Sequence, residues 1–381
     1  MGKPRFTLCL VLATCAWMLT PEARVRAGGE AAGEPQEQWR IFPHPPFARS
    51  ASEEVTGRIT RQIDRFAVLY RPEGSNRSVE TLGDSLVDAK ARIQLFRLES
   101  LLRLYVKAFP DLEKYRLEVK DVEDALGDYT FAVDSLDFAK GKFRDENRSG
   151  PPDAARKAEQ DRILEGLERK KAAARVIFAR LMTRSTLDDD LPQLRSAVMS
   201  SFSGWTPSRD RQFVSHELFK VLQKVRNGRF NFNLLEDGIH EFRRQLRWFP
   251  ILVDSFDGLI LVRDDAPGAC PVPSLEKLAG TPTAKHRYSN PELKFPASRP
   301  CTISRCLLWQ VVKTTNDIGK LKDEVQGNAS VESALLDNDI DVSGSNKATA
   351  EEIARGKTYR DELYSSRALE SLMSQLSSCK S

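Results

Sequence analysis

The residues best suited to chemistry lie in Gly238–Trp248, which reads Gly-Ile-His-Glu-Phe-Arg-Arg-Gln-Leu-Arg-Trp. In a helix, His240, Arg243 and Arg247 form one row, and Arg244 lies on its flank. The row borders an apolar stripe made of Ile239, Phe242, Leu246, Phe249, Val253 and Phe256. Because an imidazole and guanidiniums at the edge of a core are costly unless an anion neutralises them, the row predicts an anion-binding site.

Arginine suits a phosphate-bearing ligand, since its guanidinium forms paired hydrogen bonds with phosphate oxygens. If His240 binds as an imidazolium, binding should strengthen as the pH falls toward about 6.5. The alternative is an ordinary helix edge, whose arginines extend into water or pair with Glu236 and Glu241. The residues alone leave both interpretations open.

A second basic row lies in the first half of the chain, on a long apolar helix, and consists of Lys90, Arg92, Arg97 and Arg103. The segment Val122–Asp128 follows that row, and Leu308–Asp317 follows the His240 row across a loop. Each half thus has a basic helix and then a helix with a Gly-Asp or Asn-Asp element. Lys220 and Lys224 would extend a basic wall if their helix lies beside the His240 helix.

Apolar spacing and helix-boundary signals predict an all-α protein without strands. The expected helices are Ser52–Tyr70, Val79–Phe109, Leu112–Phe143, Asp153–Thr183, Asp188–Phe202, Pro207–Asn227, Phe232–Val262 with a kink at Pro250, Thr302–Gln326 and Ala348–Leu376. Asp264–Pro300 is rich in proline and glycine and has no periodicity, so we expect an irregular insertion there.

This order of basic helices resembles the CHAD family, the conserved-histidine α-helical domains. Residues His240 to Trp248 are similar to the start of that family's second repeat, and Trp309–Asp317 looks like its second helix. The first half departs from the pattern, because Ala89 stands where the family has a histidine. The resemblance covers Val79–Gln326 in outline and implies two pseudo-repeated antiparallel helical bundles around a basic groove that binds inorganic polyphosphate.

The implied polyanion site contains His240, Arg243, Arg244, Arg247, Lys90, Arg92, Arg97, Arg103, Lys220 and Lys224. The expected organisation is a signal peptide (1–27), a disordered linker (28–50), an N-terminal helical half (51–228) and a C-terminal half (229–381) with its insertion at 264–300.

The sequence lacks the usual signatures of catalysis. It has neither a nucleophile-elbow motif nor a glycine-rich phosphate loop, and His216-Glu217 lacks the second histidine of a zinc-protease helix. We therefore expect a non-enzymatic protein with no cofactor, no metal and no specific nucleic-acid partner. Two alternatives stay open: an exported scaffold or protein-interaction module without a polyphosphate ligand, and a hydrolase in which carboxylates and a divalent metal face the basic row.

The N-terminus predicts export to the periplasm or the medium. Lys3 and Arg5 precede the apolar run 6–19, and small residues before Gly28 offer a cleavage site. A lipid anchor at Cys15 is the less favoured interpretation, and no later stretch is apolar enough to span a membrane. Loss of residues 1–27 would remove four basic residues and one acidic residue, lowering the net charge from +4 to +1. Any anion site must then come from local clustering.

Four cysteines remain after residues 1–27, namely Cys270, Cys301, Cys306 and Cys379. An oxidising compartment would permit three pairings among them. Because Cys270 and Cys301 bracket the proline-rich insertion, we expect them to form a loop staple, with Cys306 and Cys379 either joined or free.

Overall fold

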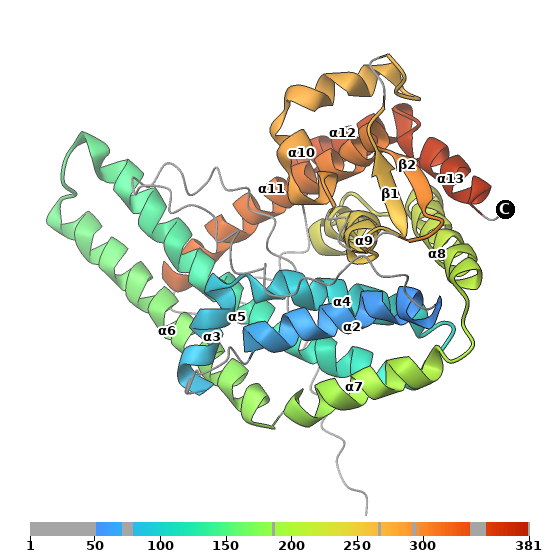
Figure 1. Cartoon of the computed structure of the whole chain (residues 1–381). Coiled ribbons are helices and arrows are strands. Elements are labelled where there is room, and N and C mark those ends of the chain that lie inside the picture. Colours follow the sequence, from blue (N-terminus) through green and yellow to red (C-terminus); the bar gives the residue numbers. More distant parts are fainter. Residues whose placement is uncertain are drawn as a thin grey trace, which may run out of the picture.

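The computed structural model describes residues 51–70, 79–184, 187–265, 268–291, 295, 297–335 and 348–379, and it is predominantly helical (Figure 1). The all-α prediction is confirmed in this coarse sense. The α-helices are α2 (Ala51–Tyr70), α3 (Val79–Asp88), α4 (Ala91–Tyr105), α5 (Glu113–Glu146), α6 (Ala154–Arg184), α7 (Leu187–Ser201), α8 (Pro207–Asn227), α9 (Glu241–Ser255), α10 (Pro282–Lys285), α11 (Arg305–Leu335), α12 (Ala350–Ser365) and α13 (Ala368–Ser378).

Two predicted helices are each divided by a residue with positive φ. Lys90, at φ 52°, separates α3 from α4, and Arg367, at φ 56°, separates α12 from α13. Both breaks fall within runs whose apolar spacing continues on either side, so periodicity alone joined the helices. By contrast, α8 has the predicted bounds, because Thr206 caps its start through a hydrogen bond from the Arg209 amide to its side chain.

The prediction that the chain has no strands is wrong. Strand β1 (Ile260–Arg263) pairs in parallel with β2 (Cys301–Ser304), and Ile260 lies opposite Cys301. The sequence pattern assigned the β1 residues to the end of the His240 helix, because a short apolar run suits a buried strand as well as a helix. Short helices η5 (Pro273–Gly280), α10 and η6 (Arg287–Ser289) lie within the irregular insertion.

Helix α4 lies at the centre of the molecule. It packs on α2, α5 and α9, and α9 in turn packs on α8 and α11. One continuous hydrophobic core therefore contains residues from both halves of the sequence, from Val55 to Leu376. The far ends of α5 and α6 extend away from that core as a paired arm (Figure 1), and a small separate cluster that includes Phe143 and Ile163 holds the arm together.

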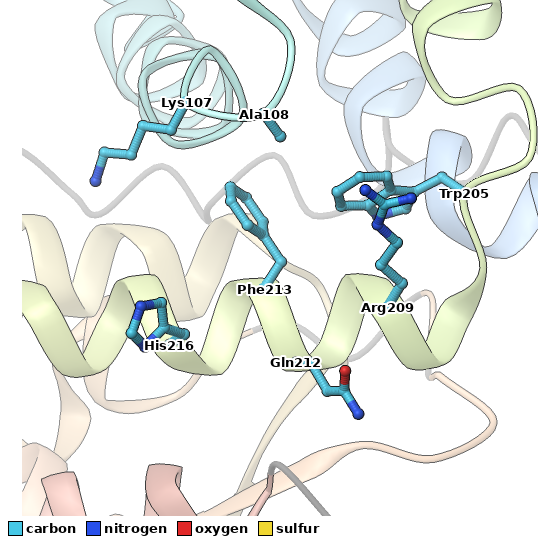
Figure 2. Close-up of a pocket in the computed structure, with 7 residues that line it drawn as sticks. All are labelled: Lys107, Ala108, Trp205, Arg209, Gln212, Phe213 and His216. Atoms are coloured by element: carbon cyan, nitrogen blue, oxygen red, sulfur yellow. The ribbon is translucent and has the colours of Figure 1, made fainter.

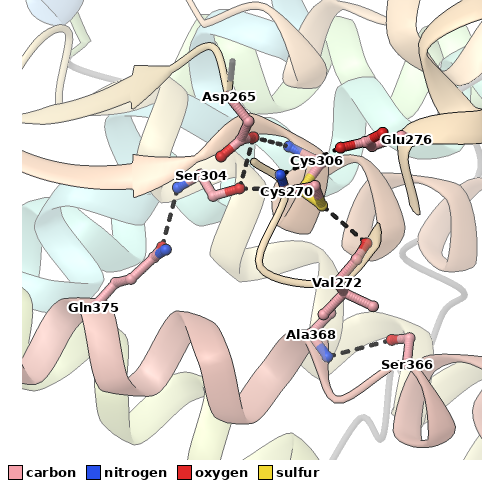
Figure 3. The surroundings of a disulfide bond; sticks show 9 residues. All are labelled: Asp265, Cys270, Val272, Glu276, Ser304, Cys306, Ser366, Ala368 and Gln375. Atoms are coloured by element: carbon pink, nitrogen blue, oxygen red, sulfur yellow. Dashed lines mark hydrogen bonds between the residues drawn. A yellow bond between two sulfur atoms is a disulfide. The ribbon is translucent and has the colours of Figure 1, made fainter. Parts of the chain in front are cut away.

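The predicted disulfide pairing is wrong. Cys270 bonds to Cys306 and Cys301 bonds to Cys379, with Cα–Cα separations of 6.2 and 5.4 Å. Cys301 lies on β2, which contacts α13, whereas Cys306 lies in the first turn of α11, which packs on η5 of the insertion. Figure 3 shows the hydrogen bonds around the first disulfide, where Asp265 accepts from the Ser304 hydroxyl and from the Cys306 amide.

No helix in the described part of the chain has the length and apolarity needed to cross a membrane. The predicted signal peptide and linker, residues 1–50, lie outside the described residues.

Candidate functional site

The His240 motif starts in a π-helical turn, η4 (Leu235–His240), and continues into α9. Gly238 allows this turn, since a Cβ at that position would clash with the backbone carbonyl of Asn231. The predicted apolar stripe is confirmed: Ile239, Phe242, Leu246, Phe249, Val253 and Phe256 are all buried in the core. Pro250 lies within α9, which continues to Ser255.

His240 is buried and does not lie at the solvent-exposed edge of its helix. Its side chain has 0% exposure, and the Lys322 ammonium lies 3.2 Å from Nε2. An ammonium donor at this position needs Nε2 as its acceptor, which a neutral imidazole provides and an imidazolium does not. Burial, and then the nearby charge of Lys322, lowers the pKa of His240 well below its ordinary range. This burial argues against the expectation that His240 would contact a ligand as an imidazolium.

Two arginines of the predicted rows lie over glycines of neighbouring helices. Arg243 in α9 donates from Nε to the carbonyl of Thr315 in α11 at 3.2 Å, and a Cβ on Gly319 would lie 2.8 Å from its Nη2. Arg92 in α4 lies over Gly127 of α5 in the same way, where a Cβ would lie 2.6 Å away. In both places the missing side chain makes room for a guanidinium between packed helices.

Carboxylates neutralise the positive charges of two buried arginines of α4, Arg97 and Arg92. Arg97 binds Asp254 through Nε to Oδ2 at 2.7 Å and Nη2 to Oδ1 at 2.9 Å, which joins α4 to α9. Arg92 donates from Nε to Glu123 of α5 at 2.8 Å. Because Arg97 and Asp254 are both nearly inaccessible to water, their bond joins the two halves of the chain and leaves no open groove at that point.

Arg247 is the member of the α9 row that contacts α4. Its guanidinium is 4.8 Å from the centre of the Phe96 ring and 5.5 Å from that of Trp248. Burial alone would raise the pKa of Glu123. The positive charges of Arg92, Lys120 and Arg247 outweigh that effect, so the pKa of Glu123 is lowered. Arg247 of α9 and Arg92 of α4 thus both act on one carboxylate of the protein itself, whereas Arg243 and His240 face α11.

Further acidic residues lie near Glu123, namely Asp124 and Asp128 on α5 and Glu99 on α4. Burial raises the pKa of Asp124 and that of Asp128 to about 6. Burial also raises the pKa of Glu99, whose nearest cation, Arg103, lies 3.3 Å away. Among the residues that the structure describes, no group of histidine, cysteine, aspartate and glutamate is arranged to hold a metal ion.

The other predicted site residues lie nearer the surface. Lys90, Lys220 and Lys224 are exposed, and the side chains of Arg103 and Arg244 keep 44% and 35% of their surface exposed. Arg244 donates to Glu241 at 2.8 Å. Arg103 lies 4.5 Å over the Trp248 ring, so an exposed cation of the first half contacts the motif helix of the second.

The exposed lysines of α8 adjoin a cation from the end of α4. Glu217 accepts from Lys220 at 2.8 Å and also binds Lys107. Burial opposes its charge, but the two lysines outweigh that effect and lower the pKa of Glu217, so the carboxylate is ionised. One carboxylate thus faces two ammonium groups, and Lys224 lies one helical turn beyond Lys220.

A cavity of about 650 Å³ opens beside these lysines (Figure 2). Its lining residues are Lys107, Ala108, Trp205, Arg209, Gln212, Phe213 and His216. Arg209 and Phe213 were not among the site residues predicted from the sequence. The signal was present, since Arg209, Phe213 and His216 share one face of a helix that begins just after Trp205.

No protein-family model, curated protein or solved structure matches this chain.

Proposed function

We propose that this protein binds a polyanion without catalysis, and that the ligand is inorganic polyphosphate, as the CHAD resemblance implies. The proposed contact surface is an exposed cationic face made of Arg103, Lys107, Lys220 and Lys224. The buried members of the predicted rows, among them Arg97 and Arg243, hold the helices together instead. This division keeps the predicted ligand but moves it to the surface.

The shared carboxylate of Glu217 is the observation that carries the proposal. Because Glu217 neutralises only one of Lys107 and Lys220, a positive charge remains, and Lys224 adds another. A ligand with repeated charges gains from such a surface, since each further contact is intramolecular once the first has formed. The exposed ends of these side chains are accessible to a long anion without any opening of the core.

We also propose that the two halves are pseudo-repeats, as the family resemblance implies. The support is the matched packing of Arg92 on Gly127 and of Arg243 on Gly319. These pairs align Leu126-Gly127 with Ile318-Gly319, so Gly319 corresponds to the first-half glycine better than the Asn316-Asp317 element does. In that alignment Ala89 corresponds to His240, three residues before its arginine.

Export remains part of the proposal. Two disulfides that close loops of different length favour an oxidising compartment, as secreted and periplasmic proteins have. The predicted targeting features of residues 1–27 agree with that location.

The second candidate function is a scaffold or protein-interaction module without a polyphosphate ligand. The pairing of Arg97 with Asp254 and of Arg92 with Glu123 favours it, because these buried arginines are already neutralised within the fold.

Titration with fluorescently labelled polyphosphate tests the proposal. Lys220→Glu/Lys224→Glu should weaken binding by about tenfold or more, equivalent to about 1.4 kcal/mol. The matched control is Lys277→Glu/Lys285→Glu, which reverses two exposed lysines of the insertion and should bind like the parent protein. Parent affinity should also fall steeply between about 50 and about 300 mM NaCl, since exposed charges are screened.

The competing functions give other results. A scaffold would show no saturable binding at either salt concentration. Equal losses in both double variants would also contradict a localised cationic face. A hydrolase would shorten the polyphosphate chains when magnesium is added, which gel electrophoresis of the polymer would show directly.

A further inference from the structure

We propose that the cavity between the end of α4 and the first turns of α8 binds a small aromatic anion, meaning a planar ring that carries a phosphate or carboxylate group. This site goes beyond the proposed polyanion surface, because a ring has no part in binding a polyphosphate chain. Its volume, about 650 Å³, lies within the range of small-molecule sites.

Helix α8 fixes one wall of the cavity. Arg209, Phe213 and His216 follow one another at helical spacing, and Figure 2 shows Phe213 projecting from α8 toward Lys107 and Ala108. The helix start is rigid, since Pro207 occupies its first position and the Thr206 side chain accepts a hydrogen bond from the Arg209 amide at 3.2 Å. The wall is thus pre-formed before any ligand arrives.

Aromatic rings form the apolar part of the cavity, and the core holds both of them in place. Trp205 donates from Nε1 to the buried Asp210 carboxylate at 3.2 Å. Phe213 stacks on Tyr105, with ring centres 5.7 Å apart, and meets Trp205 edge to face at 5.8 Å. Fixed rings of this kind bind a planar ligand at a small cost in side-chain entropy.

Positive groups surround those rings. Arg209 is exposed and lies 4.2 Å over the Trp205 ring. Lys107, in the turn after α4, also lines the cavity (Figure 2). The lining residues include no carboxylate, and Glu217 engages Lys107 from outside the lining set. A guanidinium over an aromatic ring still directs its N–H groups outward in its own plane, where they are available to an anion. The cavity therefore combines a ring-binding surface with donors for a negative group.

Calorimetric titration with three probes tests this inference: 2-naphthyl phosphate carries ring and charge, 2-naphthol carries the ring, and inorganic phosphate carries the charge. The parent protein should bind 2-naphthyl phosphate about tenfold tighter than either of the other probes. Arg209→Gln should remove most of the advantage of 2-naphthyl phosphate over 2-naphthol by weakening the phosphate contact. Phe213→Leu should weaken the naphthyl probes and leave inorganic phosphate unchanged.

The control is Lys285→Gln, which alters an exposed lysine of the insertion, outside both the cavity and the proposed cationic face, and should bind 2-naphthyl phosphate like the parent protein. Thermal melting verifies that each variant is folded. The inference is overturned if 2-naphthyl phosphate does not saturate the protein, or if Arg209→Gln binds it with parent affinity. Polyphosphate binding is measured separately on the same samples, so a cavity that fails leaves the polyanion proposal standing, and the reverse also holds.

Discussion

Arg97 and Asp254 lie 157 residues apart in the sequence and form a two-bond ion pair between α4 and α9. Their side chains are 2% and 1% exposed. The pair crosses from the first half of the chain to the second, and it uses an arginine that the sequence pattern assigned to ligand binding. Because Arg97 is buried, it links two helices and is not accessible to a ligand.

Asp254→Asn should therefore destabilise the protein strongly. The change removes the negative charge that Asp254 places beside the buried guanidinium of Arg97, and the loss of one member of a buried ion pair typically costs about 3–5 kcal/mol. Urea unfolding followed by circular dichroism measures the loss. Asp64→Asn removes the partner of Arg195 from an exposed pair and should cost less than about 1 kcal/mol. Similar losses in the two variants would mean that the Arg97–Asp254 pair contributes no more than a surface contact.

Gly127→Ala and Gly319→Ala should each destabilise the fold by about 1–3 kcal/mol, because the new methyl group must displace a buried guanidinium. Gly141→Ala is the matched control on α5, where a Cβ meets no atom within 4 Å. There the better helix propensity of alanine should stabilise the protein by up to about 1 kcal/mol. Thermal unfolding of the three variants distinguishes a steric clash with the arginine from a destabilising effect of alanine at any helical glycine.

The sequence allowed the local features of the fold to be predicted, because they depend on neighbours a few residues apart. The buried stripe of α9 and the bounds of α8 belong to this group. The positions of basic residues on two helices were also readable from spacing. Their surroundings were not, since the partners of Arg92 and Arg97 come from residues 31 and 157 positions away.

The role of the buried arginines was also beyond reach from the sequence, because it depends on distant residues. Whether an arginine is a ligand contact or a structural ion pair depends on carboxylates that another helix supplies, and no local pattern records them. The cavity beside α8 likewise needs Lys107 from the end of α4, more than ninety residues earlier than its other wall. Only the half of that cavity carried by α8 was visible in the sequence.

Peptide mapping under non-reducing conditions should find Cys270 linked to Cys306 and Cys301 linked to Cys379. Replacing both cysteines of one pair with serine should cost about 2–5 kcal/mol. The second bond spans 78 residues and the first spans 36. In the loop-entropy model, loss of the longer link should therefore cost about 0.6–0.7 kcal/mol more. A peptide that joins Cys270 to Cys301 would instead support the pairing expected from the sequence.

The buried neutral state of His240 predicts a loss of stability in acid. An unfolded histidine gains a proton as the pH falls below about 6.5, whereas burial and Lys322 keep the folded side chain neutral. Below that pH the unfolded chain binds more protons, so stability falls with pH, by up to about 1.4 kcal/mol per pH unit from this residue.

His240→Gln isolates this contribution, because glutamine offers Lys322 an acceptor but gains no proton. Denaturant unfolding between pH 7.5 and pH 5 should show that the parent protein loses stability relative to this variant as the pH falls. Asp124 and Asp128, whose pKa values are about 6 in the fold, act in the opposite direction between about pH 4 and 6, but they are common to both proteins and cancel in the difference. The exposed His216→Gln should follow the parent curve. Parallel curves for His240→Gln and the parent protein would mean that His240 takes up a proton within the folded protein.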